Sequence, residues 1–259
     1  MVVGDPEIDT MVSQWITEYG LWDIHVLRSL ELFAEAPCKQ GANNIVMDVG
    51  ANVGFFTMAL LAMGCEVAAF EMQPGLAELV QFSACMNGWE DKLHMTVGAV
   101  SSQTMTLHMP HVTSRNFGGL GVHAGDEGIA IQARRIDEIM DLERPVHVMK
   151  MDVEGHEYQA LQGMEHMFQK RLVNNVVMEF SPNVMPFNES VLMLEYLHEH
   201  GFKTIYEIDF EGAEAYNQPL KKHLVDTKSA NWAHNWARNI ADGGDGRHIG
   251  QTDIILSLL

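Results

Sequence analysis

Cysteine is scarce in this chain, and no stretch is apolar for long. Cys38, Cys65 and Cys85 are the only cysteines, and no two have the CxxC spacing of a zinc or redox motif. An odd and sparse set argues against a disulfide or zinc framework, so we expect reduced thiols. The first residues lack the basic stretch and apolar run of a secretory signal. No apolar run reaches the roughly 20 residues that span a bilayer. These absences predict a cytoplasmic protein.

Basic residues are also few. The 259-residue chain has 16 Lys and Arg against 35 Asp and Glu, a formal net charge of −19. A surface of that sign repels polyphosphate, so we expect neither nucleic acid nor an anionic membrane as a partner. Hydrophobic residues make up 47% of the chain, enough for one full core.

Short apolar runs alternate with segments of helical periodicity over most of the chain. The expected strands lie at residues 44–49, 65–70, 93–100, 104–109, 129–131, 146–151, 175–180, 202–208 and 252–259. The expected helices lie at residues 53–63, 74–86, 158–169 and 188–200. This alternation predicts βαβ units, a parallel sheet and right-handed crossovers.

Two segments fall outside this pattern. Residues 1–40 predict a helical segment that packs on the core, with two helices broken near Gly20 and closed by Pro37. The remaining residues, 41–259, form the main domain, with a long insertion at about 211–251. Trp232 and Trp236 in that insertion share one helix face, which favours a packed lid.

A glycine-containing turn follows the first strand of the main domain, where α/β sheets bind ligands. It reads Asp48-Val49-Gly50-Ala51-Asn52-Val53-Gly54, the pattern D-x-G-x-N-x-G. Asn52 and Phe55 stand where a dinucleotide fingerprint has glycines, and no P-loop lysine follows. Asp48 would repel a pyrophosphate but accept a hydrogen bond from an ammonium group. The turn therefore predicts a cationic, phosphate-free nucleoside, and S-adenosylmethionine is the common one.

Glu71 supports this prediction. It ends the second strand, about 20 residues beyond the turn, where an acidic side chain chelates ribose hydroxyls.

With these features the sequence resembles the FkbM family of methyltransferases from Asn44 to about Gly201. The resemblance is carried by Asp48–Gly54, Phe70-Glu71, Ala99–Ser101, Arg135–Ile139, Met149–Glu157 and Val177–Glu179. The block Lys150–Glu157 is its most specific part. One departure is visible, because Met72-Gln73 separate Glu71 from Pro74, whereas the family usually has proline directly after the glutamate.

The resemblance implies a Rossmann-like class I methyltransferase fold, with a seven-stranded, mostly parallel sheet and an antiparallel last strand. It also implies S-adenosylmethionine as the methyl donor and, from known members, a hydroxyl of a natural product or sugar as the acceptor. By position, Glu71 would bind the ribose, and Met72 and Ala99 would flank the adenine. The methionine part would be lined by Asp48, Gly50, Ala51, Asn52 and Gly54.

The chemistry is expected at the carboxyl end of the fourth strand, beside the transferred methyl group. Asp152 and His156 are the candidates for the general base that takes the hydroxyl proton. Alternatively, Asp152, Glu154 and Glu179 hold a magnesium ion that lowers the pKa of the acceptor hydroxyl. The loop from Thr113 to Gly119 is a candidate acceptor gate, in which Arg115 would grip a carboxylate or a sugar hydroxyl.

The sequence thus predicts an O-methyltransferase for a hydroxyl acceptor, either a small molecule or a glycan. The alternative is a non-catalytic module that binds S-adenosylmethionine or a partner on the same fold. A nicotinamide-dependent oxidoreductase is disfavoured by Asn52.

Overall fold

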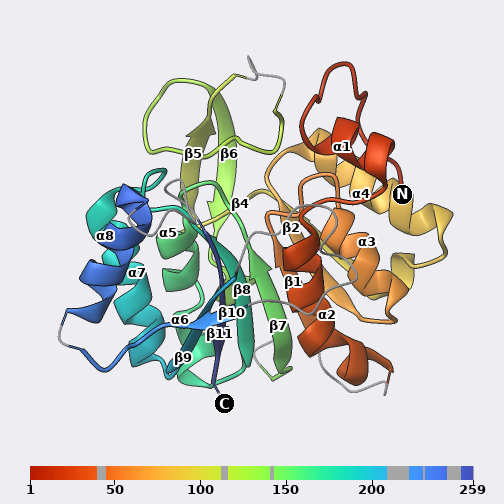
Figure 1. The fold of residues 1–259 in the computed structure, drawn as a ribbon. Coiled ribbons are helices and arrows are strands. Elements are labelled where there is room, and N and C mark those ends of the chain that lie inside the picture. Colours follow the sequence, from red (N-terminus) through yellow and green to blue (C-terminus); the bar gives the residue numbers. More distant parts are fainter. Residues whose placement is uncertain are drawn as a thin grey trace.

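One large sheet lies between two layers of helices (Figure 1). The computed structural model describes residues 1–39, 45–111, 116–140, 143–208, 222–229, 231–243 and 252–258. Within them the strand order of this sheet is β10-β9-β11-β8-β7-β1-β2-β3. Its strands are β1 (Ile45–Val49), β2 (Val67–Glu71), β3 (Leu93–Val97), β7 (Val146–Met151), β8 (Asn175–Phe180), β9 (Thr204–Ile208), β10 (Lys222–Leu224) and β11 (Thr252–Ser257).

The strand directions match the predicted fold. Strands β3, β2, β1, β7 and β8 pair in parallel, and β11 enters antiparallel between β8 and β9. The predicted Rossmann-like sheet with an antiparallel last strand is therefore confirmed. The described sheet has eight strands and not seven, because the short strand β10 from the predicted insertion pairs with the edge of β9.

Alternation along the strands divides the core into two layers. Val46 in β1 packs with the helices α2 (Ile24–Lys39), α3 (Phe55–Ala62) and α4 (Pro74–Met86). The next residue, Met47, points to the opposite face and packs with the other helices. These are α5 (Glu157–Gln162), α6 (Glu165–Gln169), α7 (Phe187–Glu199) and α8 (Trp232–Asp242). Because both faces are covered, the central strands are buried throughout.

The amino-terminal segment belongs to this architecture. Helix α1 (Val12–Tyr19) ends at Gly20, whose φ of 73° gives the left-handed cap that separates it from α2. Leu30 of α2 is fully buried in the same layer as Val46. Helix α2 continues through Pro37 to Lys39, so the prediction that Pro37 closes the helix is wrong.

A second, smaller sheet branches from the main one. It has the order β4-β6-β5 and is built from β4 (Ala99–Val100), β5 (Met105–Met109) and β6 (Ile129–Arg134). A single strand was predicted over residues 93–100. The chain instead turns at Gly98, where φ is 139° and a Cβ would lie 2.8 Å from the Gln132 carbonyl oxygen. Only glycine fits at this turn, where β3 ends at Val97 and β4 pairs in parallel with β6 of the small sheet.

The thiols differ from the expectation. Cys38 near the end of α2 forms a disulfide with Cys65, which precedes β2, and Cys85 is a free, exposed thiol. The prediction of three reduced thiols is wrong, because the fold brings together two cysteines that are 27 residues apart. This removes one argument for a cytoplasmic location, which stays a prediction. In the described part of the chain, no helix combines the length and apolar character needed to cross a membrane.

Candidate active site

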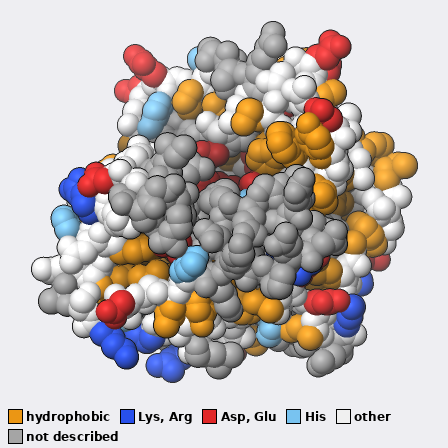
Figure 2. Space-filling view, viewed as in Figure 1, with side chains coloured by type: hydrophobic (Ala, Val, Ile, Leu, Met, Phe, Trp, Pro, Cys, Tyr) orange, Lys and Arg blue, Asp and Glu red, His pale blue; other side chains and the backbone are white. Residues whose placement is uncertain are grey.

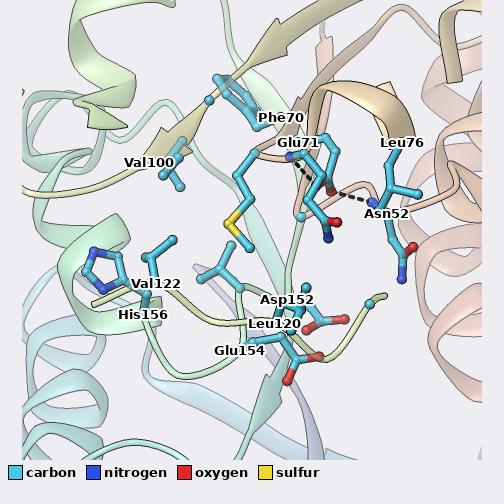
Figure 3. A pocket seen from close by; sticks show the side chains of 17 residues that line it. Asn52, Phe70, Glu71, Leu76, Val100, Leu120, Val122, Asp152, Glu154 and His156 are labelled. Atoms are coloured by element: carbon cyan, nitrogen blue, oxygen red, sulfur yellow. Dashed lines mark hydrogen bonds between the residues drawn. The ribbon is translucent and has the colours of Figure 1, made fainter. Parts of the chain in front are cut away.

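A pocket opens where the carboxyl ends of β1, β2 and β7 meet (Figure 3). It holds about 570 Å³ of space, part of it open to solvent. Its lining comes from five segments: Gly50 and Asn52; Phe70–Gln73 with Leu76; Gly98–Val100; Gly118, Leu120 and Val122; and Asp152–Glu154 with His156. The pocket therefore lies where α/β sheets bind their ligands.

The turn after β1 is held tightly against the end of β7. Gly50 has a φ of 83°, and a Cβ on it would lie 1.8 Å from the Asp152 carbonyl oxygen. The backbone N–H groups of Gly50 and Ala51 both donate to the Phe70 carbonyl at 2.9 Å. Asn52 also takes a left-handed conformation, with a φ of 54°. Glycine at position 50 is therefore required by both backbone angle and space.

Glu71 receives two backbone hydrogen bonds from the pocket wall. Its Oε2 accepts from the Asn52 N–H and its Oε1 from the Gln73 N–H, each at 2.8 Å. The side chain is buried, and burial raises its pKa above the usual value. Each carboxylate oxygen has a second lone pair, so Glu71 can still accept hydrogen bonds from two hydroxyl groups.

One end of the pocket is apolar. Met72 and Ala99 pack together with Leu120 and Val122, which come from the loop before β6. The same loop is anchored by Gln73, whose Nε2 donates to the Phe117 carbonyl at 2.7 Å. Leu120 and Val122 are not predicted from the sequence, because an isolated apolar residue in a glycine-rich loop has no periodicity that predicts burial.

The other end of the pocket is lined by acidic side chains. Asp152 and Glu154 both line the pocket, and Glu154 has a φ of 54°. Burial and the neighbouring Asp152 raise the pKa of Glu154 to about 7. A carboxyl group with that pKa can exchange a proton near neutral pH. The sequence predicts another role for Glu154, that of a magnesium ligand. Figure 2 shows acidic side chains in the hollow at the centre of this face.

Glu179 lies at the end of β8 and does not line the pocket, and it accepts a hydrogen bond from Ser181. Burial, and then the charge of Asp152, raise its pKa to about 8. Among the residues that the structure describes, no three His, Cys, Asp or Glu side chains come together as a metal site would require. The proposed magnesium site of Asp152, Glu154 and Glu179 therefore has no support in this geometry.

His156 lies across the pocket from Asn52 (Figure 3). Its Nε2 is 3.0 Å from the Ser101 hydroxyl, on the side of β4 and Ala99. Burial lowers its pKa to about 4, so the imidazole is neutral at pH 7. The structure thus brings His156 to the apolar end of the pocket, whereas Asp152 lies at the acidic end. Which of them acts as a base stays a prediction.

Three predicted cofactor residues do not line the pocket. Asp48 has no exposed surface; it accepts a hydrogen bond from the Thr57 hydroxyl at 2.6 Å and lies 3.7 Å from the Lys150 ammonium. Ala51 is buried, and Gly54 packs on Val80 of α4, where a Cβ would approach to 2.8 Å. Their contacts with a ligand stay predictions, and in this structure they support the turn from behind.

Part of the predicted acceptor gate can be placed. Gly118 lines the pocket beside Asn52, whose amide nitrogen would be 2.3 Å from a Cβ on Gly118. Thr113 to Arg115 lie outside the described residues, and so does much of the insertion at 211–251.

The order of the strands, the antiparallel β11 and a pocket between the first turn and the acidic end of β7 are features of a Rossmann-like α/β fold with a ligand site at the carboxyl edge of its sheet. The model of the methyltransferase FkbM domain matches residues 48–204, more than half of the 259-residue chain. The chain therefore belongs to the FkbM methyltransferase family, and the predicted resemblance is confirmed.

Several solved structures are similar to this chain at low sequence identity and with TM-scores below 0.5. An S-adenosylmethionine-dependent O-methyltransferase from Thermotoga maritima is 11% identical, with a TM-score of 0.47, and the alignment covers 95% of this chain and 70% of that one. Precorrin 8W decarboxylase from Methanobacterium thermoautotrophicum is 12% identical, with a TM-score of 0.48, covering 98% and 95%. WbdD is 13% identical, with a TM-score of 0.47; all of this chain aligns, but it spans only 44% of WbdD. No curated protein matches the sequence.

Proposed function

We propose that this protein transfers a methyl group from S-adenosylmethionine to a hydroxyl group of a small metabolite or sugar. One observation carries the proposal: a single pocket joins the D-x-G-x-N-x-G turn and Glu71 to the carboxylates of Asp152 and Glu154 (Figure 3). The first two features suit a nucleoside without phosphate, and the acidic end suits a group that must lose a proton.

The residues of the pocket fit the parts of this cofactor. S-adenosylmethionine supplies a methyl group on a cationic sulfonium. The free lone pairs of Glu71 would accept hydrogen bonds from the ribose hydroxyls. Met72 and Ala99, with Leu120 and Val122, would enclose the adenine between apolar surfaces. Asn52 and the backbone of Gly50 would face the methionine part.

Asp152 is placed to handle the acceptor. Its side chain is 33% exposed, and its Oδ2 lies 3.4 Å from the Lys150 ammonium. The second carboxylate oxygen can therefore accept the hydrogen bond of an acceptor hydroxyl. As the acceptor oxygen bonds to the methyl carbon and the carbon–sulfur bond breaks, the Asp152 carboxylate would take the hydroxyl proton. The net charge of −19 favours a neutral or cationic acceptor over a nucleic acid or an anionic membrane.

Two measurements test the proposal. Calorimetry should show that the protein binds S-adenosylmethionine and S-adenosylhomocysteine but not NADH. Methyl transfer from labelled cofactor to a panel of hydroxylated metabolites and sugars should then identify acceptors. Asp152→Asn should lower turnover about 100-fold or more while changing cofactor affinity much less, because it removes a general base.

The outcomes separate the alternatives. Binding of NADH without S-adenosylmethionine would refute the assignment of the cofactor. Binding of S-adenosylmethionine without transfer to any acceptor would favour a non-catalytic module. Transfer only to amines or thiols would refute the hydroxyl acceptor but not the methyltransferase activity.

A further inference from the structure

Lys150 is a buried cation at the centre of the site, and it does not line the pocket. It lies in β7 beside Asp48 of β1, and only 4% of it is exposed. Its ammonium donates to the Gly50 carbonyl at 2.8 Å, and it lies 3.4 Å from Asp152 Oδ2 and 3.7 Å from Asp48 Oδ1. A buried ammonium requires such partners, because desolvation strongly disfavours an unpaired charge.

The bond to Gly50 fixes one peptide of the cofactor turn from both sides. Lys150 holds the carbonyl of Gly50, and the N–H of Ala51 in the same peptide group donates to the Phe70 carbonyl at 2.9 Å. The next residue, Asn52, lines the pocket and donates its N–H to Glu71. The ammonium therefore acts on the part of the turn that leads directly to the pocket wall.

The ion pair with Asp152 connects Lys150 to the acceptor end of the pocket. Asp152 is the residue that the proposed function places against the acceptor. Phe56 of α3 covers the ammonium, with its ring centre 5.3 Å from Nζ, so water does not screen these contacts well. The two carboxylates, Asp48 and Asp152, keep Lys150 charged by raising its pKa against the effect of burial.

We propose that Lys150 is a positioning residue that couples the cofactor turn to the acceptor end of the pocket, because one ammonium holds the Gly50 carbonyl and the Asp152 carboxylate together. This inference rests on the proposed function. It has two consequences: Lys150 sets the position of the turn, and it offsets the negative charge that Asp48 and Asp152 would otherwise exert at the sulfonium.

A comparison of two ligands measures both consequences without a known acceptor. S-adenosylmethionine carries the sulfonium charge, whereas S-adenosylhomocysteine is neutral at sulfur and otherwise makes the same contacts. Lys150→Met should weaken binding of both about tenfold, because a buried charge-assisted hydrogen bond to the turn is lost. It should also shift the ratio of the two affinities about threefold toward S-adenosylmethionine, because the local charge becomes more negative.

Three variants serve as controls. Thr57→Val removes another hydrogen bond of Asp48 without a contact to Gly50 or Asp152, so the ratio of affinities should keep its wild-type value. Lys170→Met removes an exposed lysine that pairs with Glu143, and both affinities should stay unchanged. Lys150→Gln retains one hydrogen-bond donor for the Gly50 carbonyl but carries no charge. The loss of affinity shared by both ligands should therefore be smaller than in Lys150→Met, while the ratio of the two affinities should still shift toward S-adenosylmethionine. If Lys150→Met does not fold, as judged by circular dichroism, Lys150→Gln decides the question through the ratio.

The result that supports the inference is weaker binding of both ligands together with the shifted ratio. Wild-type affinities in Lys150→Met would overturn it. An equal loss for both ligands, with no change in their ratio, would also overturn it, because a merely structural lysine would have that effect. If the wild-type protein binds neither ligand, the proposed function fails, and the inference fails with it.

Discussion

Alanine at position 50 would bring the turn after β1 into conflict with the end of β7. Gly50 has a φ of 83°, and its Cβ would lie 1.8 Å from the Asp152 carbonyl oxygen, whereas ordinary contacts begin at 3.4 Å. A left-handed conformation costs a residue with a side chain about 1–2 kcal/mol. The overlap adds to this cost, because the atom that must move belongs to the backbone. We therefore expect Gly50→Ala to lose at least ~3 kcal/mol of unfolding free energy.

Gly88 offers a matched control. It also has a positive φ, 69°, but nothing lies within 4 Å of a Cβ built on it. Gly88→Ala should therefore lose only about 1 kcal/mol, the cost of the backbone angle alone. Urea denaturation of both variants gives the two losses, and calorimetry gives their affinity for S-adenosylhomocysteine. Gly50→Ala should lose most of that affinity, and Gly88→Ala none. Equal losses of stability, with wild-type affinity in both variants, would refute the argument that the turn and β7 are fitted to each other.

Three further outcomes are expected. Glu71→Gln should weaken the binding of S-adenosylmethionine about tenfold in calorimetry, because the buried carboxylate that accepts from two N–H groups and the ribose is lost. An equal loss of affinity in the control Glu78→Gln, at an exposed position, would contradict this. Without reductant, Cys38→Ser should lower the unfolding free energy by about 3–4 kcal/mol, because the disulfide to Cys65 closes a long loop. With reductant, the variant and the wild type should have nearly the same unfolding free energy. A variant as stable as the oxidised wild type would exclude the disulfide. The pKa of Glu154 rises from 4.5 to about 7 on folding, so the folded carboxyl becomes harder to ionise and stability falls as pH rises through this window. Glu154→Gln should therefore gain stability relative to the wild type between pH 5 and pH 8, by up to about 3 kcal/mol in urea denaturation, and a difference independent of pH would argue against the shift.

Local patterns in the sequence were enough for the main elements of the fold. The helix at Pro74–Met86 and the strand at Asn175–Phe180 have the predicted bounds, since proline at a first turn and a short apolar run are signals of nearby residues. The prediction failed at residues 93–100, where the chain changes sheets at Gly98. The partner strand of residues 99–100 is β6, more than 30 residues away in the sequence, which no local window contains.

The candidate site also has features that the local sequence predicts and contacts that only the fold creates. The turn from Asp48 to Gly54 and Glu71 were found because their chemistry follows from residue type and from position at the end of a strand. The sequence predicts that the Asp48 carboxylate accepts a hydrogen bond from an ammonium group of the ligand. In the folded protein the ammonium that faces Asp48 belongs to Lys150.

The sequence alone determined the class of fold, the family and most of the segments that form the pocket, because periodicity and short motifs are properties of neighbouring residues. Only the tertiary structure decided which of those side chains line the pocket and which support it from behind. Lys150 and Gly50 are 100 residues apart in the sequence, yet the Lys150 Nζ lies 2.8 Å from the Gly50 carbonyl oxygen. Cys38 and Cys65 are 27 residues apart and form a disulfide. Such pairings depend on the order in which strands enter the sheet, and that order is a property of the whole chain.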